Sequence, residues 1–157
     1  MTLELWCTGR SKEPWLREAT AVYAARLPHL LPFRYEEWPG PKLPRRATPE
    51  HTLQLEADYL LAKLKPTDLL VLFDEGGKSM GSRAFAEYLE RLQHRVGSRI
   101  VFLIGGAYGF GEDLRRRADG RVSLSPMTLS HQLVRAVALE QLYRGMSILR
   151  GLPYHND

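Results

Sequence analysis

The chain has 157 residues, 44% of them hydrophobic and 25% charged, and this balance excludes a disordered, collagen-like or coiled-coil protein. At about 150 residues per domain, we expect one domain over residues 1–157. The net charge of +4 is compatible with a nucleic-acid partner. The longest apolar run, Leu69–Phe73, is too short to cross a membrane, and a single cysteine, Cys7, permits neither an internal disulfide nor a cysteine-based zinc site. We therefore expect a cytoplasmic protein with no membrane or metal partner.

Strand-like and helix-like patterns alternate along the chain. Two helices are predicted to begin at a proline, Pro14 and Pro49, and a third to be capped by Ser82. The predicted strands are Leu3–Cys7, Phe33–Trp38, Leu69–Phe73, Ile100–Ile104 and Val122–Leu124. The predicted helices are 14–26, 49–64, 82–95, 112–118 and 129–148. Between them lie a proline-rich loop, two glycine-rich loops and a polar tail, at 39–49, 74–81, 105–111 and 151–157.

Five strands alternating with five helices predict an α/β fold with a mostly parallel sheet and flanking helices. The continuously apolar third and fourth strands suit a sheet that is covered on both faces. Ligands of such folds bind beyond the carboxyl ends of the strands. The loops after Phe73, Ile104 and Leu124 are therefore the candidate binding segments.

Three of these loop segments resemble ligand-binding motifs. The sequence EGGKS at 75–79 lacks the glycine that a P-loop needs at position 72, where Leu72 stands, so an NTPase is excluded. The glycines of GGAYGFG at 105–111 are spaced in the reverse of the dinucleotide-binding order, which argues against a Rossmann dehydrogenase. They still indicate close approach of the backbone to a ligand or to another backbone segment. The sequence LSPMTL at 124–129 either cradles an apolar planar group such as adenine or is a plain loop before a helix.

The last predicted helix has four polar residues on an otherwise apolar pattern. His131 and Arg135 are four residues apart and share a face, as do Glu140 and Arg144. These residues form a site or face a dimer partner.

The tail contains Tyr154 and His155, which combine stacking with acid–base chemistry. Chain ends are usually disordered, so composition alone favours a frayed tail here.

Together these segments resemble the RlmH family of the SPOUT methyltransferases. The resemblance covers essentially the whole chain, including the FDEGGK loop, and rests on IGGAYGFGEDL, RVSLSPMTLSHQLVR, EQLYRG and the terminal PYH. Two positions depart from the family pattern. Ser130 replaces the usual proline before the motif histidine, and Phe73 replaces the usual leucine.

The resemblance implies an S-adenosylmethionine-dependent enzyme that methylates N3 of a pseudouridine, at position 1915 in helix 69 of 23S rRNA, on the assembled 70S ribosome. It also implies a homodimer whose C-terminal part is tied in a trefoil knot. One protomer would hold the cofactor while the partner's tail completes the site. The cofactor contacts would then fall at Phe73, Gly105, Leu124, Ser125, Pro126, Met127, Thr128 and Leu129.

This reaction assigns candidate roles to the tail and the last helix. His155 is the candidate base for the N3 proton, and Tyr154 stacks on the target base or orders the tail. Arg144 stabilises the negative charge that develops on the flanking carbonyl oxygens, and Glu140 holds Arg144 in place.

The roles of His131 and Arg135 stay open at this stage, because both residues either contact RNA phosphate or support the fold. Two alternative functions also stay open: a SPOUT methyltransferase that acts on another RNA base, and a ribosome- or RNA-binding protein without turnover. An enzyme binds and consumes S-adenosylmethionine, whereas a binding protein need do neither.

Overall fold

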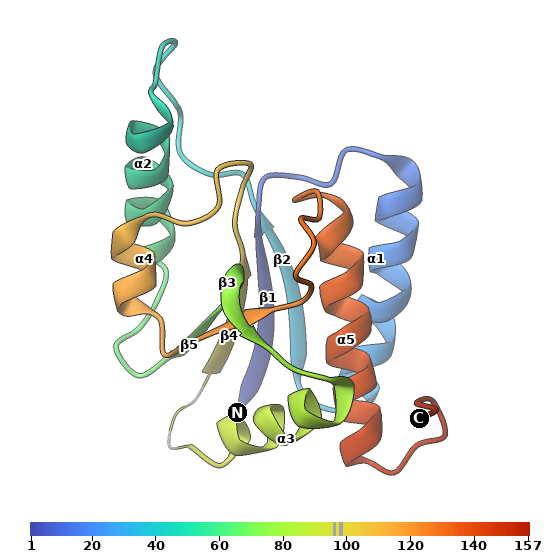
Figure 1. Ribbon diagram of the computed structural model, residues 1–157. Helices are drawn as coiled ribbons and strands as arrows, with labels where there is room; N and C mark the ends of the chain where they lie inside the picture. The colour runs from blue at the N-terminus through green and yellow to red at the C-terminus, as the bar shows by residue number, and fades with distance from the viewer. Residues whose placement is uncertain (96, 98) are drawn as a thin grey trace.

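The computed structural model describes residues 1–95, 97 and 99–157 and is built around a parallel sheet (Figure 1). The sheet has five strands in the order β2-β1-β4-β3-β5, and every neighbouring pair is parallel. The strands are β1 (Thr2–Thr8), β2 (Phe33–Trp38), β3 (Leu69–Ser79), β4 (Arg99–Ile104) and β5 (Gly120–Ser123). The predicted α/β class with a parallel sheet is thereby confirmed.

Helices cover both faces of the sheet (Figure 1). On one face lie α1 (Pro14–Arg26), the short η1 (Leu27–His29), α3 (Ser82–Gln93) and α5 (Leu133–Leu149). On the other face lie α2 (Pro49–Leu61) and α4 (Glu112–Arg117). The α2 helix begins as predicted, because the Thr48 hydroxyl accepts a hydrogen bond from the His51 backbone amide at 3.1 Å and Pro49 occupies the first turn.

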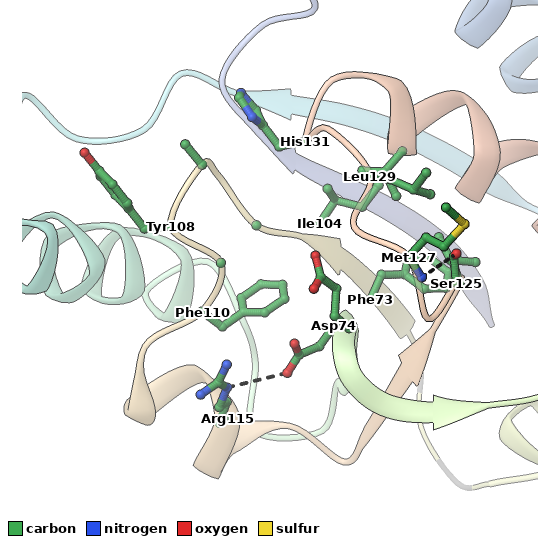
Figure 2. A pocket seen from close by; sticks show the side chains of 16 residues that line it. Phe73, Asp74, Ile104, Tyr108, Phe110, Arg115, Ser125, Met127, Leu129 and His131 are labelled. Atoms are coloured by element: carbon green, nitrogen blue, oxygen red, sulfur yellow. Dashed lines mark hydrogen bonds and ion pairs between the residues drawn. The ribbon is translucent and has the colours of Figure 1, made fainter.

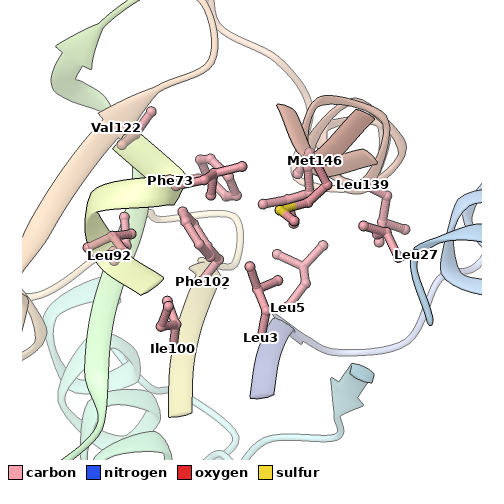
Figure 3. Packing of buried hydrophobic residues seen from close by; sticks show 14 of the residues in the cluster. Leu3, Leu5, Leu27, Phe73, Leu92, Ile100, Phe102, Val122, Leu139 and Met146 are labelled. Carbon is pink, nitrogen blue, oxygen red and sulfur yellow. The ribbon is translucent and has the colours of Figure 1, made fainter. Parts of the chain in front are cut away.

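Each face of the sheet has its own hydrophobic core. Leu3 and Leu5 of β1 point into the larger core, with Phe102 of β4 and with α3 and α5 above them (Figure 3). Trp6, which alternates with them, points into the smaller core under α2 and α4. Burial on both faces explains why the central strands are apolar without interruption.

The third strand is longer than the sequence predicts. It continues beyond Phe73 to Ser79, so the prediction of a loop at 74–81 is wrong over most of its length. After a break in register, the end of β3 pairs with β5. Glycine permits this pairing, because a Cβ on Gly77 would lie 2.7 Å from backbone atoms of β5. Gly77 therefore allows the backbone of β3 to approach the backbone of β5 closely.

The start of the last helix is also later than predicted. The α5 helix begins at Leu133 rather than at residue 129, because 124–132 crosses the carboxyl ends of the strands before the helix forms. Ser130, one of the two departures from the family pattern, accepts a hydrogen bond from the Leu133 amide at 3.0 Å through its hydroxyl. A serine thus organises the turn that leads into α5.

Smaller differences lie at other element ends. The N-cap of α3 is Gly81, without a side-chain cap, so the capping role predicted for Ser82 is wrong. The α3 helix ends at Gln93 rather than Arg95, and α2 ends at Leu61 rather than residue 64. The β5 strand starts two residues earlier than predicted. Across the described residues, no helix is both long and apolar enough to cross a membrane.

Candidate functional site

A cavity of about 340 Å³ opens at the carboxyl ends of β4 and β5 and beside the middle of β3, where Phe73 precedes the break in register (Figure 2). This is the edge of the sheet where the sequence places the binding segments. Six of the eight predicted cofactor residues line the cavity: Phe73, Gly105, Leu124, Ser125, Met127 and Leu129.

Pro126 and Thr128, the other two, do not line the cavity and instead belong to the turn that shapes its wall. The Thr128 hydroxyl donates to Glu75 Oε2 at 3.3 Å. Within the same turn, the Met127 amide donates to the Ser125 hydroxyl at 3.0 Å. These bonds fold the 124–129 segment over the end of β3.

The walls of the cavity combine apolar and acidic side chains. Phe73, Ile104 and Leu129 supply the apolar surface, and Asp74 lies on one side with Arg115 beside it (Figure 2). Glu75 also lines the cavity, and Asp74 is paired with both Arg115 and Arg121. The volume lies in the range of small-molecule pockets. A ligand with a flat apolar group and polar or charged groups fits these walls.

The glycine-rich loop after β4 forms the remaining wall. A Cβ on Gly105 would lie 2.7 Å from the Gly109 carbonyl oxygen and 3.2 Å from the Phe110 ring. Gly109 has φ +72°, and its amide donates to the Gly106 carbonyl at 3.1 Å. The loop therefore folds tightly on itself and presents backbone to the cavity.

A second group of polar residues lies on α5 and the tail. Arg144 donates to Glu140 Oε1, and the Tyr154 hydroxyl donates to the same oxygen at 3.0 Å. The Arg144 guanidinium also lies 4.8 Å from the centre of the Tyr154 ring. The structure thus brings all four predicted catalytic residues together, because His155 Nδ1 lies 3.2 Å from Arg144 Nη1.

The tail is held by side chains, so the expectation of a frayed end is wrong. The Tyr154 hydroxyl lies 3.2 Å from the Tyr23 hydroxyl of α1, and its ring packs edge-on against Tyr143. Asp157 forms an ion pair with Arg83 of α3. Burial raises the pKa of the Tyr154 phenol, and its bonds to Tyr23 and Glu140 raise it further, so this hydroxyl stays protonated.

The contacts of His155 define its tautomer. A guanidinium is only a donor, so Nδ1 of His155 accepts from Arg144 and carries no proton. In the neutral ring the proton is then on Nε2, which donates to Asp157 Oδ1 at 3.2 Å. The hydrogen bond to Glu140 raises the pKa of Arg144, which keeps the donor charged. Both ring nitrogens of His155 are therefore engaged.

The cavity and the tail cluster are separate within one chain. None of Glu140, Arg144, Tyr154 and His155 lines the cavity. Val134, at the start of α5, does line it, and Arg144 is ten residues further along the helix, or about 15 Å. The tail lies near the far end of α5 (Figure 1). One chain thus holds two half-sites that do not meet.

Arg135 is fully buried, with a side chain of 0% exposure. Its Nη atoms donate to the Thr8 and Gly9 carbonyls, each at 2.8 Å, and to Glu37 Oε2 at 3.0 Å. Burial alone would raise the pKa of Glu37, but bonds from Ser11 and the charge of Arg135 outweigh it and hold this pKa below its ordinary value. Arg135 therefore ties α5 to the ends of β1 and β2, and its burial leaves no surface for RNA contact.

His131 lies at the edge of the cavity, away from Ser125 (Figure 2). It precedes α5, so the predicted shared helical face with Arg135 does not form. Burial lowers the pKa of His131, and the cations of Arg135 and Lys12 lower it further. The His131 ring is thus held neutral in a positive local field.

Three residues of the tail cluster were missed by sequence reasoning: Tyr23, Arg83 and Asp157. No local pattern in the sequence marks them. Asp74, which directly follows a predicted strand, lies in the cavity with Arg115 at 3.5 Å. In the part of the chain that the structure describes, no group of three or more metal-ligating side chains occurs.

Comparison with known proteins places this arrangement in a family. A family model described as a predicted SPOUT methyltransferase matches residues 1–155, so the class is that of the SPOUT methyltransferases. Proteins named ribosomal RNA large subunit methyltransferase H are similar over the full chain. The one from Cytophaga hutchinsonii is 42% identical over 99% of this chain and 100% of its own length. The one from Parabacteroides distasonis is 40% identical over 100% of both chains.

The chain therefore belongs to the ribosomal RNA large subunit methyltransferase H family, which confirms the resemblance found in the sequence. A crystal structure of a hypothetical protein is similar in fold, with a TM-score of 0.54 at 16% identity over 95% of this chain and 68% of the other.

Proposed function

We propose that this protein transfers a methyl group from S-adenosylmethionine to N3 of the pseudouridine at helix 69 of 23S rRNA in the assembled 70S ribosome. The observation that carries the proposal is the full-length similarity to proteins named ribosomal RNA large subunit methyltransferase H. The cavity and the tail cluster supply the two parts that such a transfer needs. A ribosomal substrate implies that the protein works in the cytoplasm, as a single domain over residues 1–157.

The cavity at the ends of β4 and β5 is our proposed cofactor site. When bound, S-adenosylmethionine supplies an electrophilic methyl group on a sulfonium. Phe73, Ile104 and Leu129 suit the flat adenine, and Glu75, which forms no ion pair within the described residues, suits the cationic part of the molecule. We also propose that the chain is knotted here. The crossing of 124–132 over the strand ends, between β5 and α5, is the feature that supports a knot.

A homodimer follows from the separation of the two half-sites. The cavity of one chain is lined by no residue of that chain's tail cluster. In a dimer, the partner's tail meets the cavity, and each active site has residues of both chains. Positioning of the target base against the methyl group then supplies most of the rate enhancement.

The tail cluster performs the proton transfer in this proposal. Arg144 leaves His155 Nδ1 and donates to a carbonyl oxygen beside N3 of the target base, where negative charge develops. The same movement frees Nδ1 to accept the N3 proton as the new N–C bond forms. Asp157 keeps Nε2 protonated and fixes the ring. Glu140 restrains Arg144, and Tyr154 orders the tail through its bonds to Glu140 and Tyr23.

Replacing Gly105 with alanine tests the cofactor site. The added Cβ would meet the Gly109 carbonyl oxygen at 2.7 Å, and backbone at that distance has to move. We expect affinity for S-adenosylmethionine to fall by at least tenfold, as measured by isothermal titration calorimetry. Gly81→Ala is the matched control, because nothing lies within 4 Å of a Cβ there. Equal affinity of the two variants would remove this loop from the site.

Methylation of defined ribosomes tests the whole proposal. The protein is incubated with methyl-labelled S-adenosylmethionine and 70S ribosomes that lack the modification, and the labelled nucleotide is mapped. Free subunits, and ribosomes with uridine in place of the pseudouridine, are the controls. We expect label at helix 69 in 70S ribosomes alone. Label on another base would indicate a different RNA target. Absence of both label and cofactor binding would indicate a binding protein.

A further inference from the structure

A second cavity, of about 210 Å³, lies beside the first at the carboxyl ends of β1 and β2. We call it the β1–β2 cavity. It is lined by the segment after β1, by the proline-rich loop after β2, and by Glu56 of α2. It shares Ala107 and His131 with the first cavity, so the two are direct neighbours. The proposed reaction assigns no role to it.

The open end of the β1–β2 cavity is basic. Arg10 and Lys12 are both exposed, and within the described residues neither side chain forms an ion pair. The charge of Lys12 contributes to the lowered pKa of His131, which shows that a positive field extends into the cavity. At the inner end stands Glu56, whose carboxyl lies close to Gly106. An anion is therefore favoured at the open end and opposed at the inner end.

The backbone around these cations is fixed in a way that favours an anion. The carbonyls of Thr8 and Gly9 accept from Arg135, and the Arg10 carbonyl accepts from Gln132 at 3.4 Å. The same Gln132 accepts from the Lys12 amide at 3.1 Å. Three carbonyl oxygens that would otherwise repel an anion are thus occupied. Gly9, with φ +82°, permits this turn.

The proline-rich loop offers apolar contact. Pro39, Pro41 and Leu43 line the cavity, and Leu43 is 48% exposed. A basic end and an apolar wall match the phosphate and the base of a nucleotide.

We propose that the β1–β2 cavity binds a nucleotide of the substrate RNA next to the target base, with its phosphate at Arg10 and Lys12 and its base against the Pro39–Leu43 wall. This proposal rests on the proposed function, since the nucleotide belongs to the same RNA strand. The shared wall at Ala107 and His131 places this nucleotide next to the cofactor cavity, where the target base meets the methyl group. The cavity thus positions the substrate and takes no part in the chemistry.

Charge removal at the open end tests this subsite. We expect the double variant Arg10→Ala/Lys12→Ala to raise KM for 70S ribosomes by about tenfold, with kcat and S-adenosylmethionine affinity changed less than twofold. The slope of log KM against log salt should fall by about two, because two phosphate contacts are lost. The matched control is Lys65→Ala/Arg91→Ala, which removes the same charge from exposed positions outside both cavities.

The outcomes separate this proposal from the function it rests on. If the unaltered protein methylates no ribosome, the proposed function fails. If it methylates ribosomes and the double variant matches the control in KM and salt slope, only the subsite fails. A change in oligomeric state, seen by sedimentation, would show that Arg10 and Lys12 contact a second copy of the chain instead, which also overturns the subsite.

Discussion

Replacing His155 with alanine is expected to slow methyl transfer by roughly 10²- to 10³-fold and to leave affinity for S-adenosylmethionine unchanged. The factor is that of a positioned general base. The affinity is unchanged because the proposal places His155 against the N3 proton of the target base, whereas the cofactor contacts are the residues that line the cavity. Single-turnover methylation of 70S ribosomes and calorimetric titration of the cofactor measure the two quantities.

A structural role for His155 predicts a different result. The ring also contacts Arg144 and Asp157, so its loss could act by loosening the tail. Added imidazole distinguishes the two roles, because it restores a proton acceptor and cannot restore the tail. We expect imidazole to recover part of the turnover of His155→Ala. His94→Ala, at the end of α3, is the control and should keep full activity. Turnover of His155→Ala within threefold of the unaltered protein would exclude His155 as the base.

The fold was predictable because its signals are local. Apolar runs at 69–73 and 100–104 and proline starts at Pro14 and Pro49 each depend on a few neighbouring residues. The extension of β3 was not predictable, because the sequence turns polar and glycine-rich after Phe73 while its partner, β5, lies more than 40 residues further along the chain. A pattern within one strand carries no information about such a partner.

The two half-sites also differ in whether they depend on local or on long-range contacts. Phe73, Gly105 and the 124–129 segment follow predicted strands, so an α/β fold already brings them to one edge. The tail cluster depends instead on the contact between Tyr23 and Tyr154, which are 131 residues apart. Composition predicted a frayed end there. The chemistry of Tyr154 and His155 was noted from the sequence, but only the resemblance to a family gave them roles, and the structure adds the contacts that hold them.

The sequence pattern around Arg135 did not decide whether this residue contacts RNA or supports the fold. A spacing of four residues from His131 suggested a shared surface, with phosphate contact as one of two roles. The side chain instead points into the protein and donates to the Thr8 and Gly9 carbonyls. These carbonyls lie at the end of β1, beneath the basic end of the β1–β2 cavity. Arg135 thus supports the cavity that we propose binds RNA, and its own side chain stays buried.

Replacing Arg135 with methionine is therefore expected to destabilise the fold by about 3–5 kcal/mol, the usual result of removing one partner of a buried ion pair. Methionine has a similar length and fills most of the space, but it leaves two carbonyls without their donor. It also removes the cation beside Glu37, which keeps only its bonds from Ser11 and Tyr35. The free energy of unfolding in urea measures the effect. Arg91→Met, at an exposed position on α3, should change it by less than about 0.5 kcal/mol.

The double variant Arg135→Met/Glu37→Gln separates the ion pair from the backbone contacts. Neutralising Glu37 removes the carboxylate charge that has lost its Arg135 cation, so this variant should recover part of the lost stability. The orphaned carbonyls of Thr8 and Gly9 remain, so recovery should be incomplete. A loss below about 1 kcal/mol for Arg135→Met alone would mean that solvent or a neighbouring donor replaces the guanidinium. The link between α5 and the ends of β1 and β2 would then depend on packing, and the surface beneath Arg10 and Lys12 would keep its shape without Arg135.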